Sequence, residues 1–262
     1  MDKQIITKYS NHLNRDMTIR TYGYAGTPIL VFPCQDSMSD NFETFGMIDE
    51  LSAWLESGLI RFFCVDTVDK DSWSDVGGDK KHRIEVQEAY FNYIIEEALP
   101  IVYDLCGGFV RPYVTGCSLG ATHSVIFFFR RPDLFDGVIA LSGCYDTYFF
   151  WDGWHDDLVY ENSPVHFLAN MPKDHPYIDI YNQKKMIICV GQGAWEEEGI
   201  RTAKLLRDTF AEKGINAWVD FWGTDAAHDW DWWYKQVEYF VPYLLGEKTR
   251  LRAMAQKSAD FH

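Results

Sequence analysis

Residues 113–121 read YVTGCSLGA, and Gly116, Ser118 and Gly120 form a G-x-S-x-G pattern within them. The residues on either side predict a strand over 111–115 and a helix over 119–129 that stops before an Arg-Pro pair. A serine at the apex of such a strand-turn-helix has a strained backbone, and its hydroxyl stands clear of the sheet. The pattern therefore predicts that Ser118 is a nucleophile.

The two glycines and the helix that follows support this interpretation. A side chain at Gly116 or Gly120 would collide across the tight turn. The first turn of the helix points its N–H groups and positive dipole end at the place where an oxyanion would develop. The simpler alternative is an ordinary glycine-flanked turn between a strand and a helix, without catalytic meaning.

A nucleophilic serine needs a base, and the base needs a carboxylate to orient it. Among the eight histidines, His228 is the best placed, because it lies between a predicted strand over 217–222 and a predicted helix over 232–245. A histidine on a loop late in the chain fits the order serine, acid, histidine. We therefore expect His228 to be the base.

The acid is expected after the predicted strand 186–190, where the chain reads GQGAWEEE over residues 191–198. No aspartate occurs in that stretch, so a glutamate would have to reach the histidine. Glu196 is the first candidate, Glu197 the second and Asp225 a distant third. The alternative is that these glutamates only charge the first turn of a helix over 197–213, where carboxylates suit the helix dipole.

Three stretches together resemble a known family. They are GCSLGA at 116–121, AHDW at 227–230 and GQG at 191–193. They are similar to the putative-esterase family of the α/β-hydrolases, which includes esterase D, feruloyl esterases, siderophore esterases and mycolyltransferases. The third stretch resembles the Gln-Gly-x-x-acid segment of esterase D relatives, and in that register the acid falls on Glu196. The family's aspartate is replaced here by glutamate.

The oxyanion hole is expected to use the N–H of the residue after the nucleophile, which is Leu119. A second donor should come from the loop after the predicted strand 28–32, which reads PCQDS over 33–37. The usual His-Gly pair is missing there. The resemblance implies the backbone of Gln35 as second donor, with Cys34 as the near alternative, although the loop could also be a plain polar connection.

Strands and helices alternate along the chain, which predicts a mostly parallel sheet covered by helices on both faces. Further strands are expected at 18–23, 61–66 and 137–141, and further helices at 43–56 and 83–105. The 262 residues are predicted to form one α/β-hydrolase domain, 1–262. The three proposed catalytic residues all fall at the carboxyl ends of strands.

The stretch 144–185 interrupts this alternation and is rich in aromatic residues. Because it follows the strand that ends at 141, we expect it to lie beside the nucleophile as a lid or pocket wall. Tyr145 and Trp151 are predicted to lie nearest the substrate. Trp195 and Trp230 flank the presumed acid and base and are also predicted to line the pocket, the alternative being that they only brace their loops. Simple packing of a lid is an equally good explanation.

Composition narrows the classes of partner. The formal net charge of −15 disfavours nucleic acid and anionic membrane surfaces. No converging set of metal ligands is visible, no cofactor is expected, and no apolar run is long enough to span a bilayer. The N-terminus lacks a signal-peptide pattern, and the six cysteines have no paired spacing, so we expect reduced thiols and a cytoplasmic location. Homo-oligomers are possible.

The sequence thus predicts a serine esterase that works through an acyl-enzyme on a small acyl or aryl ester. Three alternatives remain open. The same machinery could serve a thioesterase or an acyltransferase. The fold could also belong to a serine peptidase. The missing aspartate and His-Gly pair are compatible with a non-catalytic binding protein.

Overall fold

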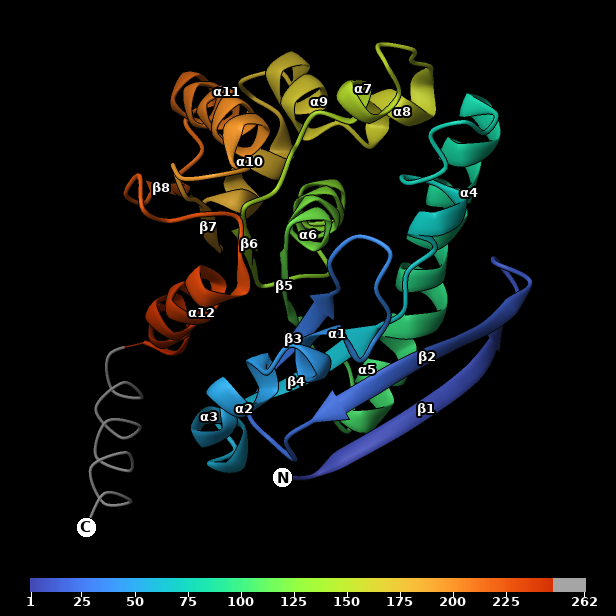
Figure 1. Ribbon diagram of the computed structural model, residues 1–262, viewed down its shortest axis with the longest axis vertical. Helices are drawn as coiled ribbons and strands as arrows, with labels where there is room; N and C mark the ends of the chain where they lie inside the picture. The colour runs from blue at the N-terminus through green and yellow to red at the C-terminus, as the bar shows by residue number, and fades with distance from the viewer. Residues whose placement is uncertain (247–262) are drawn as a thin grey trace.

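An eight-stranded sheet forms the centre of the computed structural model, which describes residues 1–246 (Figure 1). The strand order is β1-β2-β4-β3-β5-β6-β7-β8. The pairs β1–β2 and β2–β4 are antiparallel, and all pairs from β4 onward are parallel. The carboxyl ends of six strands therefore meet at one edge. The strands are β1 (Lys3–Ser10), β2 (Arg15–Tyr22), β3 (Thr27–Phe32), β4 (Ile60–Val65), β5 (Tyr113–Cys117), β6 (Gly137–Leu141), β7 (Lys185–Val190) and β8 (Trp218–Phe221).

The central strands are apolar on both faces and separate two hydrophobic cores. Successive side chains of a strand point to opposite faces. In β3, accordingly, Ile29 and Val31 join one core, whereas Leu30 and Phe32 join the other. This pattern is typical of a parallel sheet that is buried on both sides. It explains why these strands contain almost continuous apolar runs.

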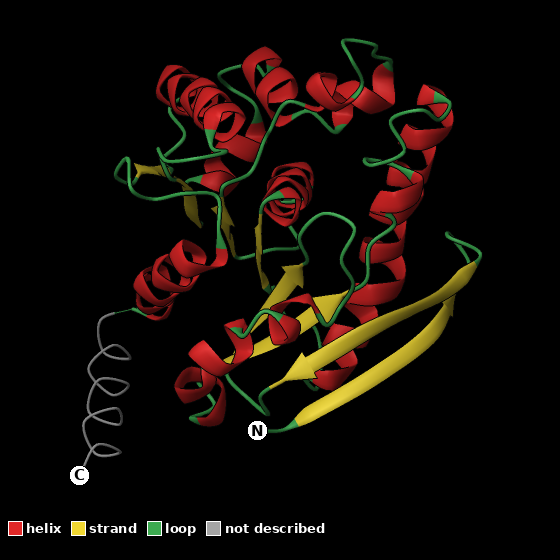
Figure 2. Cartoon of the chain, in the orientation of Figure 1, coloured by secondary structure: helices red, strands yellow, loops and turns green. Residues whose placement is uncertain are grey.

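Helices cover both faces (Figures 1 and 2). The face of Phe32 packs against α4 (Lys80–Tyr93), α5 (Leu99–Leu105), α6 (Leu119–Arg130) and α11 (Glu197–Lys213). The opposite face packs against α1 (Asn41–Thr44), α2 (Met47–Glu50), α3 (Ser52–Glu56) and α12 (Trp230–Leu245). The predicted mostly parallel sheet with helices on both faces is confirmed. The residues of the predicted domain beyond 246 lie outside the described part of the chain.

The seven predicted strands all occur, with small shifts at their ends, and α11 has the predicted bounds. Strand β1 was not predicted from the sequence. This strand lies at the edge of the sheet and forms a hairpin with β2, and most of its side chains are exposed or partly exposed. Without a buried face it carries little of the apolar pattern by which strands are found.

Two predicted helices are interrupted. The helix predicted over 43–56 is divided into α1, α2 and α3, and Gly46 lies between the first two with φ of 80°. The helix predicted over 83–105 runs from α4 through a π-helical turn, η2 (Ile94–Ala98), into α5. Pro100 is the second residue of α5, and because proline has no N–H and crowds the preceding turn, a widened turn accommodates it.

The insertion at 144–185 folds into four short helices. Its backbone is tied to the α4 region, because Lys80 Nζ donates to Trp151 O and Trp151 Nε1 donates to Lys80 O, both at 2.9 Å. Within residues 1–246, no helix combines the length and apolar character needed to cross a bilayer. The helices are α7 (Thr147–Phe150), α8 (Asp157–Glu161), α9 (Pro164–Asn170) and α10 (Pro176–Tyr181).

Candidate active site

Ser118 lies at the turn between β5 and α6 and has φ of 58° and ψ of −127°. A non-glycine residue with positive φ is uncommon, and such strain collects at functional turns. The neighbouring glycines permit the turn. A Cβ on Gly116 would meet the backbone of Gly120, and a Cβ on Gly120 would meet the carbonyls of Phe32 and Pro33. The end of β3 can therefore lie directly against the serine turn.

His228 lies on the loop between β8 and α12, and its ring faces the serine. His228 Nε2 lies 2.9 Å from Ser118 Oγ. The loop is anchored because the His228 N–H donates to Ala194 O at 3.0 Å. The ring also packs edge-on against Trp233, with centroids 5.0 Å apart. These contacts bring together two residues that are 110 positions apart in the sequence.

Glu196 is fully buried and lies on the other side of the histidine. Its Oε2 is 3.3 Å from His228 Nδ1, while its Oε1 accepts hydrogen bonds from Ser142 Oγ at 2.6 Å and the Gly191 N–H at 3.3 Å. Glu197 and Asp225, the other two candidates from the sequence, are exposed. Of the three, Glu196 is the one that contacts the histidine.

The orientation of the imidazole follows from these partners. A buried carboxylate accepts, so Nδ1 carries the proton and donates to Glu196. Nε2 is then free to accept the proton of the Ser118 hydroxyl. The ring keeps about a quarter of its surface exposed, with a side-chain exposure of 25%, so it also borders solvent.

Ser142 is part of this cluster and was not predicted from the sequence. It follows β6, is buried and has φ of 58°. Its hydroxyl accepts from Trp233 Nε1 at 3.0 Å and donates to Glu196, so it joins α12 to the carboxylate. The only sequence signal was its position in a Leu-Ser-Gly turn at the end of a strand, which carries no motif.

The candidate oxyanion donors border the same cavity. Leu119 is the first residue of α6, and Gln35 lies on the loop after β3. The N–H of Cys34, the alternative donor, is already engaged by Asn41 Oδ1 at 3.0 Å. This contact favours Gln35 over Cys34 as the second amide.

A cavity of about 160 Å³ opens beside Ser118 and His228. Gln35, Leu119 and Trp195 border it, and Trp195 is 82% exposed. Much of its apolar wall comes from α7, the first helix of the insertion, through Phe149 and Phe150. Part of the insertion therefore lines the same cavity as Ser118.

Three predicted pocket residues lie elsewhere. Tyr145 and Trp151 are buried in the core and are not among the residues that line the cavity, because their rings pack inward beneath the insertion. The Trp151 ring lies under the guanidinium of Arg83. Trp230 stacks on Phe45, with centroids 4.8 Å apart, and braces the start of α12. The fourth predicted pocket residue, Trp195, does line the cavity, and Phe149 and Phe150 line it without having been predicted.

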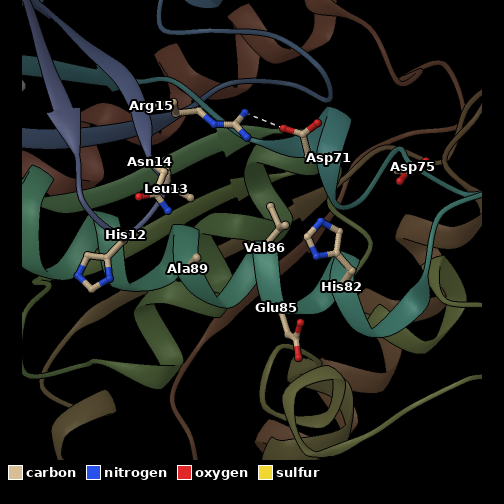
Figure 3. Close-up of a pocket in the computed structure, with 10 residues that line it drawn as sticks. All are labelled: His12, Leu13, Asn14, Arg15, Asp71, Asp75, His82, Glu85, Val86 and Ala89. Atoms are coloured by element: carbon tan, nitrogen blue, oxygen red, sulfur yellow. Dashed lines mark hydrogen bonds and ion pairs between the residues drawn. The ribbon is translucent and has the colours of Figure 1, made fainter.

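A larger cavity, of about 480 Å³, lies away from this cluster (Figure 3). It is formed by the β1–β2 turn, the segment around Asp71 and one face of α4. Figure 3 shows Arg15 paired with Asp71 across one side of it. None of Ser118, His228 and Glu196 borders it. The larger cavity is not bordered by the proposed nucleophile or base, so the smaller cavity is the candidate active site.

Three solved structures with similar folds are distant from this chain in sequence. A ferulic acid esterase superposes with a TM-score of 0.73 at 14% identity, over 93% of this chain and 97% of that one. An S-formylglutathione hydrolase from Agrobacterium tumefaciens gives 0.69 at 13% identity, over 96% and 94%. A CE1 ferulic acid esterase from Anaeromyces mucronatus gives 0.67 at 15% identity, over 94% and 91%.

These likenesses show the fold, which is that of the α/β-hydrolases. No curated protein matches the chain closely enough in sequence to stand as a relative. The profile of the family described as "Putative esterase" matches residues 10–243, which is most of the chain. The chain therefore belongs to this esterase family, and it is a serine carboxylic ester hydrolase.

Proposed function

We propose that this esterase hydrolyses small carboxylic esters through an acyl-enzyme on Ser118, with His228 as general base and Glu196 as the acid that orients it. The observation that carries the proposal is the continuous relay of Ser118 Oγ, His228 Nε2, His228 Nδ1 and Glu196 Oε2, with steps of 2.9 Å and 3.3 Å. Both are within or near the range in which an unliganded active site holds its catalytic hydrogen bonds.

In the first half of the reaction, His228 Nε2 takes the proton of Ser118 while Oγ attacks the ester carbonyl. The imidazolium that forms is stabilised by the Glu196 carboxylate on Nδ1. His228 then gives the proton to the departing alkoxide, which leaves as the alcohol. Water attacks the acyl-enzyme by the same route, and the acid is released.

The negative charge that develops on the carbonyl oxygen needs donors fixed in advance. We assign these to the N–H groups of Leu119 and Gln35. Both residues border the cavity, and the engagement of the Cys34 N–H by Asn41 supports the choice of Gln35. The dipole of α6 adds a positive field at the same place.

The cavity supports a small acyl group. Its volume of about 160 Å³ is below the several hundred Å³ typical of sites for drug-sized ligands. Phe149 and Phe150 provide apolar surface for an acetyl or short acyl chain, and the exposed Trp195 provides a surface against which the alcohol can lie. The similar structures named above include enzymes described as ferulic acid esterases and as an S-formylglutathione hydrolase, so aryl and thioester substrates belong in the same panel.

We also propose a cytoplasmic location. All six cysteines lie within the described residues as free thiols, and three of them are buried in strands. Free thiols are usual in reducing compartments. Fractionation of the native host would test this, and recovery of the protein outside the reducing compartment would contradict it.

The first experiment is turnover of p-nitrophenyl acetate and butyrate by the wild type and by Ser118→Ala. We expect the loss of Ser118 to remove turnover, and we expect a fluorophosphonate probe to label the wild type at Ser118 by mass spectrometry. Undiminished turnover in Ser118→Ala would rule out the proposed mechanism. A wild type that neither turns over nor is labelled would favour the binding-protein alternative.

Two further substrates separate the remaining alternatives. An acetyl thioester and an aminoacyl p-nitroanilide can be compared with the oxygen ester at equal concentration, and added methanol tests acyl transfer. We expect the oxygen ester to give the highest kcat/KM. Faster cleavage of the anilide would identify a peptidase. More methyl ester than free acid at methanol concentrations far below that of water would identify an acyltransferase, because a hydrolase passes the acyl group mainly to water.

A further inference from the structure

A second buried histidine–carboxylate pair lies behind the oxyanion loop. His123, on α6, places Nε2 at 2.9 Å from Oδ1 of Asp69, and both side chains are completely buried. Asp69 begins the short helix η1 (Asp69–Asp71), which follows β4. The His123 ring packs against the rings of Phe32, Trp73 and Tyr90. Burying polar groups costs free energy unless they are hydrogen-bonded to one another, so the position of this pair calls for an explanation.

The same carboxylate holds the loop after β3. Asp69 Oδ2 accepts the N–H of Asp36 at 3.3 Å, and Asp36 has φ of 61°. Asp69 also holds the side chain of Gln35 indirectly. Its backbone carbonyl accepts the N–H of Ser74 at 2.8 Å, and Ser74 Oγ accepts from Gln35 Nε2 at 2.7 Å. Two of the loop residues are therefore fixed from the Asp69 side.

These contacts restrict the peptide that carries the Gln35 N–H. The Cys34 carbonyl of that peptide accepts the N–H of Ser37 at 3.1 Å. In a trans peptide the N–H points away from the C=O, so this hydrogen bond sets the direction of the Gln35 N–H. The peptides before and after are held by Asn41 and by Asp69. The amide that we assign to the oxyanion hole lies between two anchored neighbours.

The other oxyanion donor, the N–H of Leu119, belongs to the helix that carries His123. The His123–Asp69 hydrogen bond thus joins the helix of one donor to the loop of the other. The carboxylate also affects the thiol of Cys34. The pKa of Cys34 is raised to about 12, chiefly by burial and secondly by the charge of Asp69. Asp69 is close enough to act on this loop electrostatically as well as by hydrogen bonding.

From this geometry we propose that Asp69 and His123 are positioning residues, which fix the Gln35 amide relative to the Leu119 amide so that both can bind the oxyanion of the ester reaction. The inference rests on the proposed function. Neither side chain touches the substrate. Their effect should therefore appear in the transition state more than in substrate binding.

The histidine serves here as a donor. His123 Nδ1 has no hydrogen-bond partner among the described residues. A proton on Nδ1 would leave a buried donor unsatisfied, so the tautomer with its proton on Nε2 is favoured. An amide side chain can also donate, which makes His123→Gln a conservative replacement. His123→Ala removes the donor altogether.

The experiment compares kcat and KM for p-nitrophenyl acetate in Asp69→Ala, Asp69→Asn, His123→Ala, His123→Gln and Ser118→Ala. We expect Asp69→Ala and His123→Ala to lower kcat about 10- to 100-fold with little change in KM, below the loss caused by removing an oxyanion donor outright. His123→Gln should restore most of the activity lost in His123→Ala. The Ki for phenylboronic acid, which forms a tetrahedral adduct with the serine, should rise in parallel with the fall in kcat.

Two controls separate positioning from simple loss of stability. Tyr181→Phe removes another buried hydrogen bond, from the tyrosine hydroxyl to Phe129 O at 2.7 Å, far along α6 from the serine. It should lower the Tm without changing kcat. Ser74→Ala, at a partly exposed position, should fold normally and lower kcat by a few-fold because it frees the Gln35 side chain.

The outcomes are distinct. If Ser118→Ala keeps full turnover, the proposed function fails. If Ser118→Ala is inactive while a folded Asp69→Asn and a folded Ser74→Ala both keep the kcat and boronate Ki of the wild type, the positioning role is overturned and the proposed function stands. The role would also be overturned if the Asp69 and His123 variants changed kcat and KM by the same factor, since that pattern indicates a structural effect.

Discussion

Two buried carboxylates lie at the carboxyl edge of the sheet, and each is paired with a histidine. Glu196 meets His228 Nδ1 at 3.3 Å and accepts the Gly191 N–H, while Asp69 meets His123 Nε2 at 2.9 Å and accepts the Asp36 N–H. The two pairs have similar partners. They differ at the far nitrogen of the imidazole.

The far nitrogen of His228 contacts the Ser118 hydroxyl at a partly exposed site, whereas that of His123 is buried and has no partner among residues 1–246. A histidine that is hydrogen-bonded to a carboxylate can act as an acid or base only if its other nitrogen has a group with which to exchange a proton. The first pair can therefore do acid–base chemistry, and the second can only hold structure. A buried histidine–carboxylate contact is not in itself a sign of catalysis.

The largest expected difference comes from replacing each histidine by glutamine. His228→Gln should lower kcat by about 10⁴-fold or more, because an amide cannot act as a base. His123→Gln should keep kcat within about fivefold of the wild type, because only the donor is needed there. Stopped-flow or plate assays with p-nitrophenyl acetate measure both. Equal losses in the two variants would break the comparison.

Neutralising the two carboxylates is the next test. Glu196→Gln should lower kcat by about 10³- to 10⁴-fold, since the histidine loses its preferred tautomer and the stabilisation of the imidazolium. Asp69→Asn should lower it several-fold, up to about tenfold, because an amide oxygen still accepts the Asp36 N–H. Glu197→Gln, at an exposed neighbouring position, serves as the matched control and should retain activity. A larger loss in Asp69→Asn than in Glu196→Gln would reverse our assignment.

Removing the hydroxyl that supports Glu196 should have a smaller effect. In Ser142→Ala the carboxylate loses its shortest hydrogen bond, at 2.6 Å, and the Trp233 N–H loses its acceptor. We expect kcat to fall by about 10-fold and the Tm to fall by several degrees, because two buried polar groups are left unpaired. The thermal melt and the ester assay are run on the same sample. Unchanged values for both would show that Glu196 is held without Ser142.

The smallest effect concerns the thiol near Asp69. Burial and the Asp69 charge raise the pKa of Cys34 to about 12, so very little thiolate is present at pH 8. Removal of the negative charge in Asp69→Asn lowers this pKa, although burial, the larger cause, remains. We expect iodoacetamide to modify Cys34 a few-fold faster in Asp69→Asn at pH 8, measured by peptide mass spectrometry. A slower rate would contradict the electrostatic contact.

Residue pattern was sufficient to predict the parallel sheet, the Ser118 turn and the loop of His228. Each of these has a local signal: an apolar run, glycines at a fixed spacing, or a histidine after a strand. The edge strand β1 has no buried face, so its sequence carries no such local signal. The break at Gly46 and the π-turn before Pro100 depend on single residues inside otherwise helical segments, which a periodicity argument averages out.

The supporting residues of the site were beyond such reasoning. Ser142 and Asp69 act through partners 54 residues away in the chain, Glu196 and His123 respectively, and serine and aspartate are common at the ends of strands. Tyr145 and Trp151 were placed in the pocket because the insertion is aromatic. The periodicity of a four-residue helix is too short to tell which of its neighbouring rings point inward, and α7 turns residues 149 and 150 to the cavity.

The route of the chain through the sheet has a consequence for how the enzyme acquires activity. The relay joins segments that are 110 and 32 positions apart, and it needs β5, β7 and β8 to be in register before any of its hydrogen bonds can form. Contacts of such long sequence separation are slow to close. After dilution from denaturant, the helical signal should return first and ester turnover last, so that regain of activity reports completion of the whole sheet.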